Sequence, residues 1–298
     1  MKILVTGGTG FVGGAIVHEL RARDLDVRAL VRSPRSAERV RVLGVEPAFG
    51  DVTDGAALLA AARGCTHVVH LVAIIRGRRS EFERVMVGGT RNVIAAARTA
   101  GVQRLVHLSA LGVSEQTRAL TPYFAAKWQM EQDVAGSGIE HVVFRPSFVF
   151  GREGGALPTF VRQVRLSPVV TVIGSGRRRV QPVWVEDVAA HVAAALELER
   201  AANRTFELGG PDVVTWDELY RRIAKALGKR RPLLHVPAAA ARSGARLTEW
   251  VPGAPLTADQ VTMIEDAGDN VVSGTETVDV FGLPLVPLDE QLRRACAR

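Results

Sequence analysis

The chain has 298 residues, of which 47% are hydrophobic and 23% charged, and its formal net charge is +7. This length and composition can build a large apolar core, and they fit one long domain or two unequal ones. No apolar run reaches the roughly 20 residues of a membrane-spanning helix, which excludes a transmembrane protein. A strand pattern follows Met1 almost at once, so we expect no signal peptide and a cytoplasmic location.

The cysteines and the basic residues exclude further classes. Cys65 and Cys296 are too few for a disulfide framework or a metal site, and we expect no metal. Two arginine clusters, at 76–79 and 177–179, lack the interleaved aromatic residues of a nucleic-acid platform. We interpret each cluster first as a solvated loop. The alternatives are contacts with an anionic substrate, a partner protein or an acidic membrane surface.

Short β-branched runs alternate with helical patterns through the first half of the chain. Strands are predicted near 2–7, 26–31, 45–49, 67–72, 104–109 and 140–146, and helices near 11–23, 55–63, 82–100 and 124–137. This alternation indicates βαβ units. The fold class is therefore α/β, with a doubly wound parallel sheet of the Rossmann type over residues 1–150.

After Gly151 the alternation of strand and helix patterns ends, and the chain continues as short segments separated by glycine and proline. Helices are predicted near 186–199 and 215–227, and a proline-rich tail begins at 232. We interpret residues 151–298 as a smaller α+β lobe for substrate or partner, with residues 176–190 returning to the first domain. A cleft between the two lobes is expected.

The segment TGGTGFVG follows the first strand and opens an amphipathic helix. In this context Gly7 permits a tight turn, Gly10 lets backbone N–H groups approach a pyrophosphate, and Gly13 allows close packing of helix and strand. The same loop contributes Thr9, Phe11 and Val12 to the predicted dinucleotide site. The alternative is a plain turn.

The end of the second strand decides which dinucleotide is expected. An acidic residue there would hold the ribose hydroxyls, whereas this chain has Arg32-Ser33-Pro34-Arg35. We expect Arg32, assisted by Arg35 or Ser33, to bind the 2′-phosphate of NADP(H). NADP(H) is favoured and NAD(H) stays open.

Further cofactor contacts are expected at the ends of the next two strands. Asp51 and Val52 follow the third strand and are predicted beside the adenine. Leu71, Val72 and Ala73 follow the fourth strand and are predicted to border the riboses. These positions follow from the rule that ligands bind at the carboxyl ends of parallel strands.

Tyr123 and Lys127 stand four residues apart in a predicted helix, so they share one face. An ammonium this close is expected to lower the pKa of the phenol, making it a proton donor or acceptor in hydride transfer. Lys127 is also predicted to contact the nicotinamide ribose, and Ser109 to hydrogen-bond the substrate oxygen. The alternatives are a packing tyrosine and a helix-capping serine. His70 and His107 are interpreted as core residues with satisfied hydrogen bonds.

The chain resembles an extended, or rather an atypical, short-chain dehydrogenase/reductase over nearly its whole length. The matching segments are TGGTGFVG, Asp51-Val52, GTRN (89–92), HLSALG (107–112), YFAAK (123–127), FRPSFVFG (144–151) and WVEDVA (184–189). The set is most similar to the branch that contains the nucleotide-binding accessory subunit of respiratory complex I and its bacterial relatives. That branch is not uniformly enzymatic, and the resemblance leaves association with a respiratory complex open.

The resemblance implies that Pro146 and Ser147 line the nicotinamide end of the site, and that Glu186 and Asp187 cap a helix. Ala110 and Met86 depart from the usual pattern of extended members. The leading interpretation is an oxidoreductase that transfers hydride between NADP(H) and a carbonyl or alcohol. The alternatives are a non-catalytic nucleotide-binding structural or assembly protein and, second, a nucleotide-sugar epimerase or dehydratase.

Overall fold

A seven-stranded sheet lies at the centre of the computed structural model, which describes residues 1–248 and 256–297. All of its strands are parallel, in the order β11-β6-β5-β4-β1-β2-β3. Their bounds are β1 (Lys2–Thr6), β2 (Asp26–Val31), β3 (Glu46–Phe49), β4 (His67–His70), β5 (Arg104–Leu108), β6 (Glu140–Pro146) and β11 (Arg204–Leu208). The chain order reverses between β1 and β4, which is where such sheets bind ligands.

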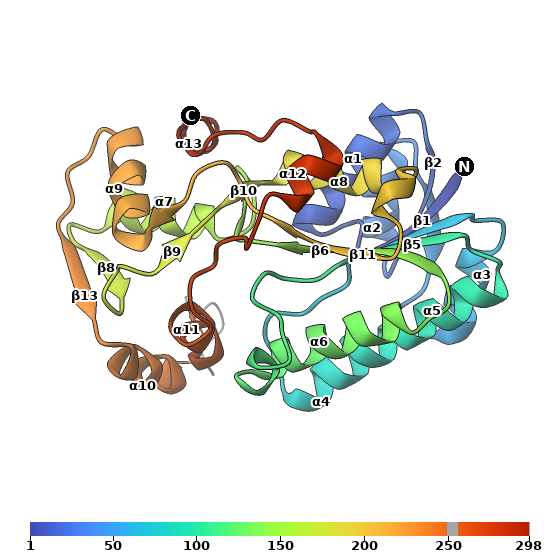
Figure 1. Ribbon diagram of the computed structural model, residues 1–298, viewed down its shortest axis with the longest axis horizontal. Helices are drawn as coiled ribbons and strands as arrows, with labels where there is room; N and C mark the ends of the chain where they lie inside the picture. The colour runs from blue at the N-terminus through green and yellow to red at the C-terminus, as the bar shows by residue number, and fades with distance from the viewer. Residues whose placement is uncertain (249–255, 298) are drawn as a thin grey trace.

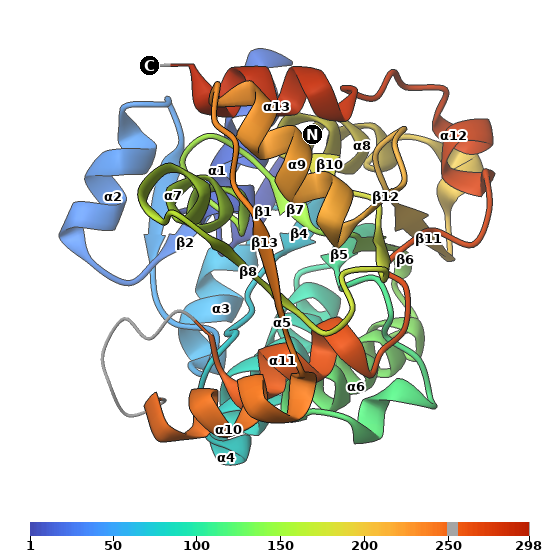
Figure 2. The same cartoon turned by 90° about the vertical axis from the view of Figure 1, so that its left-hand side faces the viewer.

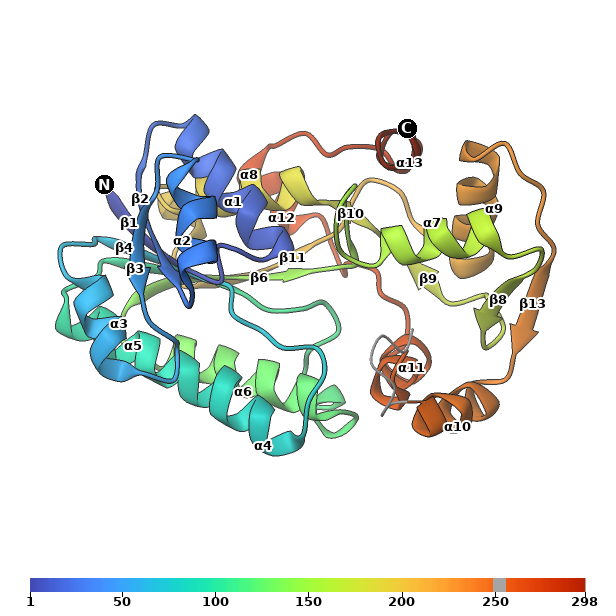
Figure 3. The same ribbon diagram turned by 180° about the vertical axis from the view of Figure 1, so that it is seen from behind.

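Helices cover both faces of this sheet (Figure 1, Figure 3). One face carries α1 (Phe11–Ala22), α2 (Pro34–Arg41), α8 (Val185–Ala195) and α12 (Glu276–Phe281), and the other carries α3 (Gly55–Ala62), α5 (Gly89–Thr99) and α6 (Pro122–Ala135). Alternate side chains of β5 enter the two cores, Val106 the first and Leu105 the second. The predicted α/β class with a doubly wound parallel sheet is confirmed.

The predicted strands of the first half all form, but two neighbouring elements differ from expectation. The predicted helix over 82–100 follows a short α4 (Arg79–Glu81) and is divided into a π-helix, η1 (Phe82–Gly88), and α5. Helix α2 was not predicted, because its sequence is highly charged and only Ala37 and Val40 are buried. It begins because Ser33 caps the N–H of Ser36 and Pro34 occupies the first helical position.

The second unit is built from short strand pairs and helices, and Figure 2 looks onto it. Its core contains Phe150, Trp184, Trp216 and Tyr220. The pairs are β7 (Val149–Phe150) with β10 (Val183–Trp184), β8 (Val170–Ile173) with β13 (Leu233–Val236), and β9 (Arg179–Val180) with β12 (Val214–Thr215). The helices are α7 (Leu157–Leu166), α9 (Trp216–Ala226), α10 (Ala238–Thr248), α11 (Ala258–Glu265) and α13 (Leu288–Cys296). Two 3-10 turns belong to the first unit, η2 (Thr117–Ala119) before α6 and η3 (Glu199–Ala201) between α8 and β11.

The chain passes between the two units several times. Residues 185–208 and 276–281 lie with the parallel sheet as α8, β11 and α12. Of the segment 176–190 that was expected to return, only the α8 part does so, because β9 and β10 pair with strands of the second unit. Asp187 joins this layer to the tail, because its carboxylate accepts a hydrogen bond from the Val286 N–H at 2.8 Å. Within the described residues, no helix is long and apolar enough to cross a membrane.

Candidate active site

The glycine turn after β1 is shaped by close backbone contacts. Gly7 has a φ of +79°, and a Cβ there would lie 3.2 Å from the backbone of Leu71 and Val72 on the neighbouring strand end. A Cβ on Gly13 would lie 2.1 Å from the carbonyl oxygen of Gly7. Glycine is therefore required at both positions for α1 to begin directly against the end of β1.

The start of α1 is left open to an anion. Gly10 supplies no side-chain cap, and the first turn contains no acidic residue. The N–H groups of this turn and the helix dipole therefore present positive potential where β1 ends. The Phe11 side chain points elsewhere, because Cβ atoms on Gly151 and Gly154 would lie 2.6 and 2.3 Å from its ring. The predicted contribution of Phe11 to the cofactor site is thus confined to its backbone.

Arg32 stands exposed at the end of β2. Its side chain is 81% accessible, and its guanidinium lies 3.8 Å from the carboxylate of Asp51, the residue expected beside the adenine. Arg35 is exposed in the first turn of α2. Ser33 is engaged as the cap of that helix, at 3.2 Å from the Ser36 N–H. Two guanidinium groups are therefore accessible at this strand end.

The turn after β3 is held by α5. Asn92 donates a hydrogen bond to the carbonyl of Val52 at 2.9 Å, and a Cβ on Gly89 would lie 2.8 Å from the Val52 side chain. The GTRN segment thus fixes Val52 beneath the turn. The Asp51 carboxyl is half-buried, which raises its pKa, but hydrogen bonds from the backbone and hydroxyl of Thr53 outweigh burial and lower that pKa overall. Across the turn, Leu71 and Val72 are half-buried and Ala73 is exposed.

Lys127 is a fully buried lysine at the end of β5. Its Nζ donates a hydrogen bond to the Leu108 carbonyl at 2.6 Å, and only 2% of the residue is accessible. Burial lowers the pKa of this ammonium to about 8, and the charge of Glu131 acts in the opposite direction. The carboxylate of Glu131 is itself held by Arg145 of β6, with Nε at 2.9 Å. This ion pair fixes α6, and with it Lys127, against the sheet.

Two buried histidines lie on the same side of the sheet, and sequence reasoning missed their arrangement. Thr90 donates its hydroxyl to the Met86 carbonyl at 2.7 Å, so it accepts from His70 Nε2 at 3.0 Å. Nδ1 of His70 then accepts from Thr6 at 2.7 Å. His107 stacks on His70 with ring centroids 5.4 Å apart. His70 is satisfied as expected, whereas Nε2 of His107 has no partner among the described residues, contrary to expectation.

Ser109 extends β5 by one residue, since its N–H donates to the Phe144 carbonyl at 2.7 Å. Alternation along the strand places its side chain on the same face as that of His107. The hydroxyl is buried and has no hydrogen-bond partner within the described residues. Ser109 therefore has a buried, unpartnered hydroxyl on the face of the sheet that α6 covers. The spacing of two residues between His107 and Ser109 in a predicted strand was the sequence signal that could have placed both side chains on one face of the sheet.

Tyr123 lies in the first turn of α6, one turn before Lys127. Its ring packs edge-on against Phe82 of the π-helix, with centroids 6.4 Å apart. Burial raises the pKa of its phenol to about 12. The expectation that the ammonium lowers this pKa is wrong for this structure, because Lys127 directs its Nζ to Leu108 and desolvation dominates at the phenol.

The strand end after β6 is closed by a late segment of the chain. Ser147, expected near the nicotinamide, donates its hydroxyl to the Asn270 side chain at 2.5 Å. Pro146 is buried, and its carbonyl accepts from the Leu111 N–H at 2.8 Å. The structure therefore ties Ser147 to the second unit. Glu186 and Asp187 lie in the first turn of α8, at its positive end, but neither caps it: α8 begins at Val185, and its N-cap residue, Trp184, supplies no side-chain cap.

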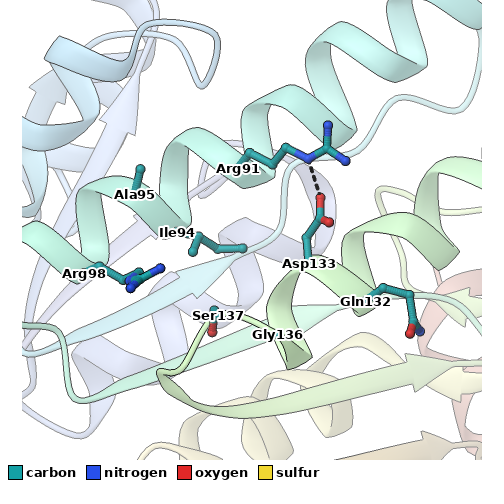
Figure 4. Close-up of a pocket in the computed structure, with 8 residues that line it drawn as sticks. All are labelled: Arg91, Ile94, Ala95, Arg98, Gln132, Asp133, Gly136 and Ser137. Carbon is teal, nitrogen blue, oxygen red and sulfur yellow. Dashed lines mark hydrogen bonds and ion pairs between the residues drawn. The ribbon is translucent and has the colours of Figure 1, made fainter.

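A shallow hollow of about 370 Å³ lies elsewhere, between α5 and α6 (Figure 4). It contains the ion pair of Arg91 with Asp133, whose N–O distance is 2.8 Å. Asp133 follows Tyr123 by ten residues on α6, about 15 Å along the helix. This hollow is therefore separate from the Tyr123 site.

The second arginine cluster is mainly structural. Arg178 donates to the Glu265 carbonyl at 3.0 Å, and Arg179 pairs with Asp269 at 2.8 Å. In the first cluster, Arg78 and Arg79 are exposed. In the part of the chain that the structure describes, no group of three His, Cys, Asp or Glu side chains could hold a metal ion.

Comparison with known proteins assigns the family. The model of the NAD dependent epimerase/dehydratase family matches residues 3–209, which include the glycine turn, Ser109, Tyr123 and Lys127. The chain belongs to this family. This family includes the extended short-chain dehydrogenases/reductases, so the resemblance seen in the sequence is confirmed.

Relatives within and near the family include enzymes and a respiratory subunit. The chain is 33% identical over 84% of its length to a ketoreductase of 4-hydroxy-2-methyl-3-oxo-4-farnesyl-3,4-dihydroquinoline-1-oxide from Stigmatella aurantiaca, and covers 80% of it. It is 32% identical over 72% of its length to subunit 9 of the NADH dehydrogenase [ubiquinone] 1 alpha subcomplex from Arabidopsis thaliana, covering 55% of it. An NADPH-dependent quinone oxidoreductase from Escherichia coli, solved with NADPH, superposes with a TM-score of 0.79 at 22% identity, over 97% of this chain and 98% of that one.

The glycine turn of this epimerase/dehydratase family member yields a matched test. In Gly13→Ala the new methyl group meets the backbone of Gly7. We expect a loss of about 1 to 3 kcal/mol of unfolding free energy and at least a tenfold loss of dinucleotide affinity. In Gly14→Ala the methyl group has open space, so stability should rise by up to about 1 kcal/mol with affinity unchanged. Urea denaturation and calorimetric titration measure both. Equal behaviour of the two variants would contradict this account of the turn.

The buried ammonium predicts how stability depends on pH. The pKa of Lys127 is about 8 in the fold against 10.5 for an ordinary lysine, so between these values the unfolded chain binds the extra proton. Unfolding free energy should therefore rise by about 1 to 3 kcal/mol from about pH 8 to about pH 10, relative to Lys127→Met. Urea denaturation at the two pH values measures this difference. The exposed Lys225, changed to Met, is the control and should behave like the unaltered chain.

Proposed function

We propose that this protein is an NADP(H)-dependent reductase that acts on the carbonyl group of a small molecule. The observation that carries the proposal is the arrangement at the end of β5. The buried Lys127 ammonium, the Tyr123 phenol one helical turn away, and the unpartnered Ser109 hydroxyl are placed on one side of the sheet. These are the groups that hydride transfer needs to donate a proton to an oxygen and to stabilise its charge.

The residues present fit a dinucleotide. The open N-terminus of α1 suits a pyrophosphate, and Gly7 and Gly13 allow backbone approach there. Lys127 has two further N–H donors beyond the one that binds Leu108, and these are available to a ribose hydroxyl. The membership in an NAD dependent family and the NADPH held by the E. coli structural neighbour support the same assignment.

Arg32 supports NADP(H) over NAD(H). Its exposed guanidinium stands at the end of β2, the position from which a 2′-phosphate is bound in sheets of this type. No acidic side chain follows β2 directly, and Asp51 is the nearest carboxylate in contact with Arg32, at 3.8 Å. Arg35, also exposed, supplies a second cation one turn away.

Tyr123, Ser109 and Lys127 have different roles in the proposed proton transfer. When bound, the reduced cofactor supplies hydride to the carbonyl carbon. Tyr123 Oη gives its proton to the carbonyl oxygen, and a pKa of about 12 keeps this phenol protonated at neutral pH. Ser109 Oγ donates a hydrogen bond to the same oxygen. Lys127 holds a positive charge at the end of β5 below about pH 8, and its remaining N–H groups would hold the ribose of the cofactor.

A second candidate is a non-catalytic nucleotide-binding protein. The observation that favours it is the 32% identity to the plant mitochondrial subunit, which is spread over 72% of this chain. The 33% identity to a ketoreductase and the free Ser109 hydroxyl favour catalysis instead. The two candidates share cofactor binding and differ in turnover.

Removing the phenolic hydroxyl tests the catalytic proposal. With a panel of ketones and quinones and NADPH as reductant, Tyr123→Phe should lower kcat at least about 100-fold and leave NADPH affinity within about twofold. Tyr220→Phe, in the core of the second unit, is the control and should retain activity. Consumption of NADPH, followed by absorbance, measures both. Full activity of Tyr123→Phe would refute the role of the phenol, and NADPH binding without turnover of any compound would support the second candidate.

Cofactor choice is tested at the end of β2. Arg32→Ala should weaken NADPH binding about tenfold or more and leave NADH binding within about twofold, because only NADPH carries the 2′-phosphate. Arg39→Ala, exposed on the same α2, should change neither affinity. Calorimetric titration with both cofactors provides the numbers. Unchanged discrimination in Arg32→Ala would remove the assignment of NADP(H).

A further inference from the structure

Nε2 of His107 is a buried ring nitrogen without a hydrogen-bond partner among the described residues. Nδ1 lies 3.2 Å from the His70 carbonyl, and a carbonyl can only accept, so Nδ1 carries the hydrogen. Burial, with the nearby charge of Lys127, lowers the pKa of His107 well below its ordinary value, so the ring is neutral. Nε2 is then an acceptor. It is fully buried and has no partner among the described residues.

The Lys127 ammonium is close enough to His107 for its charge to lower the pKa of the ring. Nζ is bound to the carbonyl of Leu108, the residue between His107 and Ser109 on β5. Strand alternation directs both of those side chains to the face on which α6 packs. Ser109 Oγ is the second buried, unpartnered polar atom of the group. The Lys127 ammonium and two unsatisfied polar atoms, on His107 and Ser109, therefore lie on one face at the end of β5.

We propose that one buried water molecule binds here, between Lys127 Nζ, His107 Nε2 and Ser109 Oγ, and that His107 is a positioning residue for the ammonium. The water accepts an N–H from Lys127 and donates its two hydrogens to His107 and Ser109. This arrangement gives both orphaned acceptor atoms a partner, and three partners are typical of buried water. It also leaves the hydrogen of Ser109 Oγ free to point outward. That last consequence rests on the proposed function, in which Ser109 donates to the substrate oxygen.

The other charged and titratable groups near Lys127 are neutral or already have a hydrogen-bond or ion-pair partner. His70 is neutral, since burial lowers its pKa to about 3, and both of its nitrogens are hydrogen-bonded. Glu131 on α6 is paired with Arg145 on β6. The phenol of Tyr123 is held protonated. His107 is thus the group whose change should act on the ammonium through the water.

Nuclear magnetic resonance of the lysines tests this without any cofactor. The chain has only four lysines, Lys2, Lys127, Lys225 and Lys229, so carbon-13 labelling of the ε-carbon gives few signals. The Lys127 signal is assigned by its loss in Lys127→Arg. In His107→Leu the bridging acceptor is lost, and the titration midpoint of Lys127 should fall by about one pH unit. His107→Gln, whose side-chain oxygen can replace Nε2, should restore most of that shift.

His191 offers a matched control. It is buried, its Nδ1 donates to the Asp187 carbonyl at 2.7 Å, and its Nε2 is also unpartnered, but it packs on Phe144 and Phe281 on the opposite face of the sheet. His191→Leu should leave the Lys127 midpoint unchanged. An unchanged midpoint in His107→Leu, or an equal shift in His191→Leu, would overturn the proposal. Because NADP(H) is absent, neither result bears on the proposed reductase activity.

A crystal structure of the unaltered protein gives a second, independent reading if His107→Leu fails to fold. The proposal expects an ordered water within about 3.2 Å of both Lys127 Nζ and His107 Nε2. A direct contact between the two nitrogens, or an empty point, would overturn it.

Discussion

A buried positive charge at the end of the central strand is the constraint on which the site depends. Lys127 reaches from α6 to the Leu108 carbonyl, and the close distance of 2.6 Å fixes the height and rotation of the helix over the sheet. The ion pair between Glu131 and Arg145 holds the next turn of the same helix. Tyr123, one turn earlier, is thereby placed beside the π-helix. Tyr123 and Lys127 are thus positioned by contacts of α6 with β5, β6 and the π-helix.

This arrangement trades stability for chemistry. A buried ammonium with a depressed pKa is unfavourable for folding at neutral pH, and Ser109 and His107 add buried polar atoms without protein partners. Such unsatisfied groups are rare in protein interiors, and among the described residues two of them lie within three residues of this one strand. The apolar cores on the two faces of the sheet offset these costs.

Local patterns in the sequence predict the sheet and the glycine turn, because each depends on residues that are close along the chain. The tyrosine–lysine spacing likewise predicts their shared helical face. Three features depend on distant contacts. The seventh strand, β11, was not predicted from its sequence, and it is recognised as a strand by its pairing with β6. The raised pKa of Tyr123 follows from packing against the π-helix, and the hold on Ser147 comes from Asn270, 123 residues later in the chain. No pattern within a short window contains that information.

The most direct measurement is a crystal structure of the protein with NADP⁺. The account predicts the pyrophosphate at the open N-terminus of α1, the 2′-phosphate against Arg32, and Lys127 Nζ within hydrogen-bond distance of the nicotinamide ribose, with Tyr123 Oη beside the ring. A cofactor bound at another strand end, or a ribose out of reach of a Lys127 that is still directed only at Leu108, would contradict it.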